Sequence, residues 1–201
     1  MKESVKPILL TSYDLVKKEP KIFTTNGCGS DYFIRDIVSG ATSAPTIFEP
    51  FPLDGMLLID ALYAKNPSLI ALSETIRSLG KEVKDTFILS IGTGYEIPSN
   101  TEKKFVPPTS GMAFISSICD SIINTHSTTH VIIDSILPVG NTLRLDLPIP
   151  SDHMDFTDIS EKNITFLIEE TGRYLEKNLD SITEFIQKIK KKPDTTPSYI
   201  G

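Results

Sequence analysis

The sequence contains no tryptophan, only two cysteines and no long run of apolar residues. The two cysteines, Cys28 and Cys119, are too few for a disulfide framework or a zinc site, so we expect two reduced thiols. A membrane-spanning helix needs roughly 20 apolar residues, and the first residues, MKESVKPILL, lack the apolar core of a signal peptide. These absences favour a cytoplasmic protein, or one exported without a conventional signal peptide.

Positive charge is also scarce, since 26 acidic and 20 basic side chains give a formal net charge of −6. This balance argues against a nucleic acid partner, because binding phosphates requires a basic face. The one dense basic run, Lys188 to Lys192, closes a helical pattern, where cations stabilise the helix terminus. We interpret it as a solvated helix end rather than a membrane-binding patch. A hydrophobic content of 39% is that of an ordinary soluble domain.

The apolar pattern predicts short strands and amphipathic helices. Strands are predicted at residues 6–14, 21–26, 56–60, 86–94 and 142–147, and helices at 31–41, 66–80, 111–137 and 160–192. The last helical pattern fits one long helix or two consecutive ones. Over 111–137 the β-branched stretch THVIIDSIL favours a strand, but the apolar period of three to four residues favours one long helix, which we predict.

The clearest predicted element is the helix at 66–80. Asn66 can cap it, Pro67 suits its first position, and Gly80 supplies a left-handed end. It lies between two predicted strands, and this order predicts a βαβ unit. The sequence therefore predicts an α/β fold with a parallel sheet covered by helices.

An acid closes the apolar run Met56–Ile59 of one predicted strand. Asp60 lies where burial is expected and an unpaired charge is costly. In a parallel α/β sheet, sites form beyond the carboxyl ends of the strands, where a base that activates a nucleophile would stand. Position alone favours the alternative that Asp60 accepts the backbone amides of a turn.

Several sequence blocks occur in the order found in the patatin-like phospholipase family. ATSAPTIFEP resembles the family's ATSAAPTYFPP, IDALYAKNPSLIALSE resembles its DGG or DGA followed by ANNP, and ILSIGTG resembles its SLGTG. KPILLTSYDL is similar to the strand and turn that precede these blocks. LRLDLPIP and MDFTDISEKNITFLIEETGRYL resemble the tail of bacterial members. The resemblance covers about residues 5–190.

By this resemblance Asp60 corresponds to the catalytic aspartate of a Ser-Asp dyad. In the family, a serine on a G-x-S-x-G elbow attacks the acyl carbonyl of a lipid ester, and the aspartate orients and deprotonates that serine without a histidine. A Gly-rich loop supplies the oxyanion hole. The resemblance implies phospholipase A or lysophospholipase chemistry, a phospholipid or other lipid ester as substrate, a membrane surface as a further partner, and no cofactor.

The sequence departs from the family pattern around the aspartate. Ala61 follows Asp60 where the family has glycine, Lys65 replaces an asparagine, and both the interval to Asn66 and the ATSAP block are one residue short. The literal Asp-Gly pair, Asp54-Gly55, precedes the strand and fits the motif worse. We therefore prefer Asp60.

The largest departure is that the 201 residues contain neither a G-x-S-x-G elbow nor a Gly-rich oxyanion segment. The near misses GCGSD, GATSA and SIGTG lack the required spacing. We therefore expect a parallel-sheet patatin-like fold that is incomplete at its N-terminal side, with a partial domain over residues 1–192 and a disordered tail over 193–201. Self-association, or a partner chain, would supply the missing half. The alternative is a non-catalytic pseudoenzyme or remnant that binds a lipid or a protein.

The remaining candidates are weaker. His126 and His130 are four residues apart on a predicted helix, but no H-E-x-x-H acid accompanies them, and we expect no metal site. Gly92 and Gly94 could cradle a phosphate, although a lone G-x-G is a weak signal. In the family this segment is a structural turn. Nothing marks His153 as functional.

Overall fold

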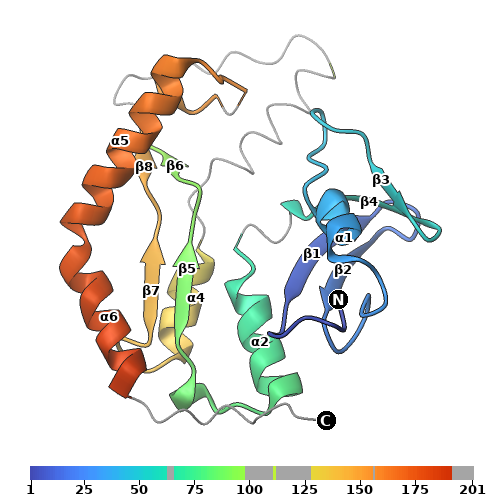
Figure 1. Ribbon diagram of the computed structural model, residues 1–201, viewed down its shortest axis with the longest axis horizontal. Helices are drawn as coiled ribbons and strands as arrows, with labels where there is room; N and C mark the ends of the chain where they lie inside the picture. The colour runs from blue at the N-terminus through green and yellow to red at the C-terminus, as the bar shows by residue number, and fades with distance from the viewer. Residues whose placement is uncertain (63–65, 98–110, 112–127, 156, 192–201) are drawn as a thin grey trace. The chain divides into compact units, whose positions relative to one another are not determined.

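The computed structural model describes residues 1–62, 66–97, 111, 128–155 and 157–191. The chain divides into two compact units, drawn in Figure 1. The described part of the N-terminal unit consists of residues 1–62, 66, 67 and 111. The described part of the C-terminal unit consists of residues 68–97, 128–155 and 157–191.

The described part of the N-terminal unit contains a four-stranded antiparallel sheet with a helix packed on it. The strands lie in the order β2-β1-β4-β3, and α1 packs against β1, β3 and β4. Its elements are β1 (Leu9–Asp14), β2 (Glu19–Thr24), α1 (Ile34–Ala41), β3 (Phe51–Leu53) and β4 (Met56–Asp60). Its buried core consists of Met1, Phe23, Ile37 and Leu58.

A two-residue turn joins β3 to β4. Leu53 pairs with Met56, and Asp54 and Gly55 between them have φ values of 46° and 77°. Positive φ at both central residues is the geometry of the type I′ hairpin turn, for which Asp-Gly is a preferred pair. The literal Asp-Gly pair is therefore a hairpin turn.

The C-terminal unit combines helices with two short parallel strand pairs. Strand β5 pairs with β7, and β6 pairs with β8. The unit contains α2 (Ser68–Leu79), η2 (Val83–Asp85), β5 (Ile88–Ile91), β6 (Tyr95–Glu96), α4 (Thr129–Ile136), β7 (Thr142–Leu145), β8 (Pro148–Ile149), η3 (Ser151–His153), α5 (Glu161–Lys177) and α6 (Leu179–Lys191). Helices α2 and α4 pack on each other through a core of Leu72, Ile133 and Leu137, and α6 packs on β7.

The mixture of helices and strands agrees with the predicted α/β class, but the βαβ unit around α2 was predicted wrongly. Strand β4 is bonded on one side to β1 and on the other to β3, both antiparallel, and β5 pairs with β7. Parallel pairing is therefore present only in β5–β7 and β6–β8 among the described strands. Helix α2 begins at Ser68, two residues after the predicted cap Asn66.

The helical periods gave correct element types where the structure describes them. The β-branched stretch at 129–136 is helical, as its period predicted, whereas 112–127 lies outside the described residues. The pattern at 160–192 forms two consecutive helices, α5 and α6. The predicted disordered tail, 193–201, also lies outside the described residues. Among the helices of the described part, none has both the length and the apolar character needed to cross a bilayer.

Close packing between α1 and β4 gives a first prediction. A Cβ on Gly40 would lie 2.7 Å from the Cβ of buried Leu58, whereas a Cβ on Gly172 in α5 would have nothing within 4 Å. We expect Gly40→Ala to lower the free energy of unfolding by about 1–3 kcal/mol through overpacking. Gly172→Ala is the matched control and should raise it by roughly 0.5–1 kcal/mol. Urea denaturation measures both, and equal gains would contradict the packing argument.

Candidate functional site

Asp60 is the last residue of β4, in the N-terminal unit. It lies directly opposite Ser12 of β1, and its backbone N–H donates a 2.9 Å hydrogen bond to the carbonyl oxygen of Ser43. Ser43 belongs to the ATSAP block that follows α1. The structure therefore brings together three segments that carry the resemblance: the strand β1, the ATSAP block and the strand that ends at Asp60.

The Asp60 carboxylate is half-buried, and no charged side chain among the described residues stabilises it. Burial raises the pKa of Asp60 above its ordinary value, and no interaction with the described residues opposes this effect. Within the described part of the chain, neither oxygen accepts a hydrogen bond or joins an ion pair. A desolvated carboxylate without a partner costs stability, and a raised pKa is a common feature of functional carboxylates.

Two buried serines lie beside Asp60, but their hydroxyl groups are used by the main chain. Ser12 Oγ donates a 2.7 Å hydrogen bond to the carbonyl oxygen of Ile59, and Ser43 Oγ donates one of 2.7 Å to that of Ser39. Both serines are buried. A nucleophilic serine needs its hydroxyl directed at the base and open to substrate. Neither side chain has that arrangement.

A second acid of the same sheet has the environment of a turn residue. Asp14 closes β1 and is fully buried, and its Oδ1 accepts hydrogen bonds from the N–H groups of Val16 at 2.9 Å and Leu57 at 3.3 Å. Burial opposes ionisation most strongly. The amides of Val16, Leu57 and Lys17, with the ammonium group of Lys21, nevertheless lower the pKa of Asp14 overall.

Asp14 was not among the predicted site residues, although its position in the sequence gives the same signal as that of Asp60. Both acids end an apolar strand. The backbone-amide environment considered as the alternative for Asp60 is found at Asp14. The two carboxylates therefore differ in what they bond, which a sequence pattern does not show.

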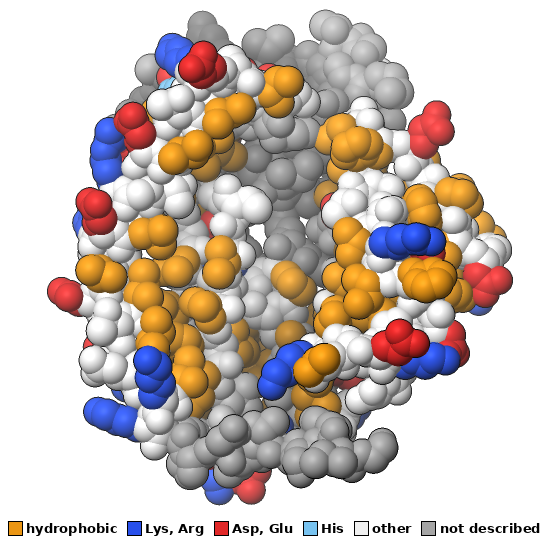
Figure 2. Space-filling view, viewed as in Figure 1, with side chains coloured by type: hydrophobic (Ala, Val, Ile, Leu, Met, Phe, Trp, Pro, Cys, Tyr) orange, Lys and Arg blue, Asp and Glu red, His pale blue; other side chains and the backbone are white. Residues whose placement is uncertain are grey.

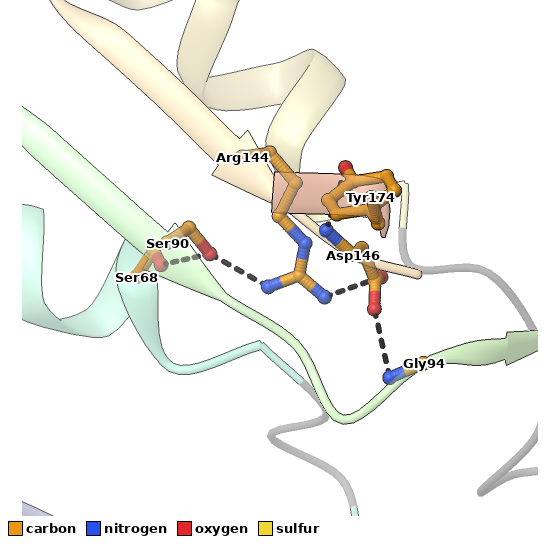
Figure 3. A network of polar contacts seen from close by, with 6 residues as sticks. All are labelled: Ser68, Ser90, Gly94, Arg144, Asp146 and Tyr174. Atoms are coloured by element: carbon orange, nitrogen blue, oxygen red, sulfur yellow. Dashed lines mark hydrogen bonds and ion pairs between the residues drawn. The ribbon is translucent and has the colours of Figure 1, made fainter. Parts of the chain in front are cut away.

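The C-terminal unit contains a second polar cluster, centred on Arg144 and shown in Figure 3. Arg144 Nη2 lies 2.6 Å from Asp146 Oδ2, with both side chains largely buried, and Nη1 donates a 2.7 Å hydrogen bond to Ser90 Oγ. Asp146 Oδ1 accepts one of 3.1 Å from the N–H of Gly94. The ion pair thus joins β7 to the turn that follows β5.

Both glycines of the SIGTG block lie close against this ion pair. A Cβ on Gly92 would lie 2.0 Å from Asp146 Oδ1 and 2.5 Å from Arg144 Nη2. Gly94 has a φ of 102°, and its N–H already donates to Asp146. An amide that serves a carboxylate is not available to a phosphate, so this geometry favours a structural role for the turn. The Arg144–Asp146 pair was not predicted from the sequence, although its i, i+2 spacing at a predicted strand was a usable signal.

The histidines of the described part have partners within the chain. His130 Nε2 lies 3.3 Å from Asp134 Oδ2, and His153 Nδ1 lies 2.8 Å from Asn163 Oδ1. Over the described ranges, no group of three or more potential metal ligands occurs. Cys28 is a free, exposed thiol. His126 and Cys119 lie outside the described residues.

Comparison with known proteins gives weak but concordant similarities. No family model matches the chain. It is 25% identical over 145 residues to "Probable inactive patatin-like protein 9" of Arabidopsis thaliana, covering 64% of this chain and 38% of that protein. It is 26% identical over 110 residues to "Patatin-like protein 6" of the same plant, covering 47% of this chain and 22% of that protein. The matches span well under two thirds of either relative and support a patatin-like relationship at family level.

The environment of Asp60 predicts how stability depends on pH. Because its folded pKa is raised, the native state loses stability as pH rises through that pKa, and the cost disappears below the unfolded value of about 3.9. We expect Asp60→Asn to hold or raise the free energy of unfolding at pH 7 by up to about 1 kcal/mol, with no gain below about pH 4. Chemical denaturation across this pH range measures the effect.

Asp14→Asn is the matched control for this measurement. Its carboxylate accepts backbone amides, so the substitution should cost about 1–3 kcal/mol at pH 7. Because the pKa of Asp14 is lowered in the folded state, its carboxylate stabilises the fold fully at pH values above the unfolded-state pKa. This stabilisation is lost as pH falls through the folded-state pKa. A loss above about 1 kcal/mol for Asp60→Asn would show that Asp60 also acts as a turn residue.

Proposed function

We propose that this chain is a patatin-like lipid acyl hydrolase component that carries the aspartate half of a Ser-Asp dyad, with Asp60 as the base. The observation that carries the proposal is the half-buried Asp60 carboxylate, which has no partner in the described residues and a raised pKa. The family-level similarity supports it. The substrate would be a phospholipid or another lipid ester, and another polypeptide or an upstream segment would contribute the serine.

In the proposed reaction, ionised Asp60 accepts the proton of a serine Oγ as that oxygen attacks the acyl carbonyl carbon. The proton then passes to the leaving alcohol. A water molecule, deprotonated by Asp60 in the same way, attacks the acyl-serine ester, and the proton returns from Asp60 to the serine Oγ as the carboxylic acid is released. A base with a raised pKa is suited to this work, because the ideal catalytic pKa lies near the working pH. The oxyanion would be bound by a Gly-rich loop outside these 201 residues.

The second candidate function is a non-catalytic lipid- or protein-binding module. The specific observations in its favour are Ala61 after Asp60 and the use of both neighbouring serine hydroxyls by main-chain carbonyl groups. One relative is itself named "Probable inactive patatin-like protein 9". In this alternative, the fold persists for binding and Asp60 is a remnant of the dyad.

Exposed apolar side chains support the proposed partner. Leu89 and Ile91 of β5 are 51% and 71% exposed. Figure 2 shows further hydrophobic side chains gathered over α5, α6 and the neighbouring strands. Those exposed on the two helices are Ile164, Ile168, Leu175, Leu179, Ile186 and Ile189. Parallel sheets normally have covered faces, and a large apolar patch marks an interaction surface. We propose that a second copy or the chain that supplies the serine covers it.

The dyad proposal predicts that the isolated chain does not hydrolyse esters, because it holds the base without a nucleophile. The purified protein would be assayed on p-nitrophenyl butyrate, then with a separately expressed segment carrying the Gly-rich loop and the G-x-S-x-G elbow. We expect activity only in the mixture, lost in Asp60→Asn and retained in Asp54→Asn, which alters an exposed hairpin turn. Hydrolysis by the chain alone, with a fluorophosphonate label on one of its own serines, would refute the proposal.

The exposed patch predicts self-association. In sedimentation velocity at tens of micromolar, we expect species larger than the 22.2 kDa chain and binding of an apolar-surface dye. Ile91→Lys should reduce both, whereas Val139→Lys, at a residue that is 99% exposed in a loop, should not. A monomer without dye binding would contradict this prediction.

A further inference from the structure

We propose that Ser12 and Asp14 are positioning residues, which hold β4 in the register that presents Asp60. The inference rests on the proposed function of Asp60, although the geometry behind it belongs to the N-terminal unit alone. Both side chains are fully buried, and both bond to the backbone of β4.

The backbone ladder between β1 and β4 is short. It comprises three residue pairs, Ser12 with Asp60, Tyr13 with Ile59 and Asp14 with Leu58. A short ladder fixes strand register weakly by itself, because other alignments offer similar backbone bonds. Burial of Leu58 on one face of β4 favours the observed register, and side-chain bonds to chosen backbone atoms add to that preference.

Asp14 extends the ladder beyond the end of β1. Its Oδ1 accepts the N–H of Leu57 at 3.3 Å, while the N–H of Leu15 donates a 2.9 Å bond to the carbonyl oxygen of Leu57. Both polar backbone groups of Leu57 are thus bonded from the β1 side. A carboxylate group accepts from the strand where a backbone carbonyl would otherwise be needed.

Ser12 bonds the other end of the same segment. Its Oγ donates a 2.7 Å hydrogen bond to the carbonyl oxygen of Ile59, the residue before Asp60. Because residues two apart on a strand face the same side, Ser12 and Asp14 act together on one face of β1. Directly opposite residues share a face as well, so this is also the face of Asp60.

A shift in the register of β4 against β1 would displace Asp60, which is why Ser12 and Asp14 matter for the candidate site. A one-residue shift of β4 would move Asp60 to the opposite face and separate Ile59 and Leu57 from Ser12 and Asp14. Buried polar groups cost free energy unless they are bonded, and apolar residues would pack at these positions more simply. The two polar side chains therefore reinforce the alignment of β4, and through it the position of the Asp60 carboxylate.

The test compares Ser12 and Asp14 with the buried hydroxyl of Thr25, which follows β2 and bonds to Ile8, the residue before β1. Thr25 Oγ1 accepts the N–H of Ile8 at 2.7 Å and donates to its carbonyl oxygen at 3.3 Å, without a bond to β4. Thr25→Val therefore removes a comparable pair of bonds from the same sheet. Ser12→Ala and Asp14→Asn remove the bonds to β4.

The readouts are the carboxyl titration of Asp60, followed by carbon-13 NMR, and hydrogen exchange of the Asp60 amide, which bonds to Ser43. In Ser12→Ala and Asp14→Asn we expect the pKa of Asp60 to fall towards about 3.9 and its amide to exchange at least about tenfold faster. Thr25→Val should leave the pKa of Asp60 and the exchange rate of its amide near their wild-type values, even if it lowers the free energy of unfolding as much as Ser12→Ala does.

An unchanged Asp60 titration in folded Ser12→Ala would overturn the inference, and that variant decides the matter if Asp14→Asn does not fold. Neither readout involves a nucleophile or substrate. A failed ester-hydrolysis experiment with an altered Asp60 titration would therefore reject the proposed function and keep the positioning role. Hydrolysis in the mixture, together with an unaltered Asp60 titration in the variants, would keep the proposed function and reject the positioning role.

Discussion

The two-residue period of β4 is the constraint on which the candidate site depends. Leu58 is fully buried against α1, where Gly40 lets the helix backbone approach. Asp60 is two residues further along the strand and therefore lies on the same face. Burial of the apolar side chain takes the carboxylate out of bulk water as well. The hydrophobic packing of the unit and the electrostatics of Asp60 thus have a common origin in one strand.

The two strand-ending acids of this sheet show how environment separates similar residues. Asp14 has no exposed surface whereas Asp60 is partly exposed, yet the ionised form of Asp14 is favoured because three backbone amides donate to it. Asp60 is only half-buried, yet its ionised form is disfavoured because nothing described donates to it. Solvent exposure alone would order their pKa values wrongly. The hydrogen-bond donors within reach decide which carboxylate stabilises the fold and which one is available for another task.

The elements were predictable where local pattern and packing agree. Strand β4 lies at the predicted residues 56–60, and the helix at 129–136 overrides its β-branched composition because Ile133 and Leu137 pack against α2. The sheet around β4 was not predicted, because strand order follows from pairings distant in sequence. One local signal was available, since Asp54-Gly55 between two apolar runs indicates a hairpin.

The candidate site was predictable only in part. Asp60 could be singled out as an acid at a strand end and placed by the resemblance. The roles of Ser12 and Asp14 depend on which backbone atoms lie opposite them, and register is not visible in a single strand. The Arg144–Asp146 pair could be suspected from its spacing on β7, but its contact with the turn after β5 depends on a parallel pairing between distant segments.

The contact of Gly92 with Asp146 has a consequence for the evolution of the sequence. A side chain at position 92 would occupy the space that the Asp146 carboxylate fills. The residue allowed at position 92 therefore depends on the residue at position 146, although a long stretch of chain separates the two positions. Among homologous sequences the two positions should covary, and a larger residue at 92 should occur only where the acid at 146 is lost and the Arg144 guanidinium is also displaced or replaced.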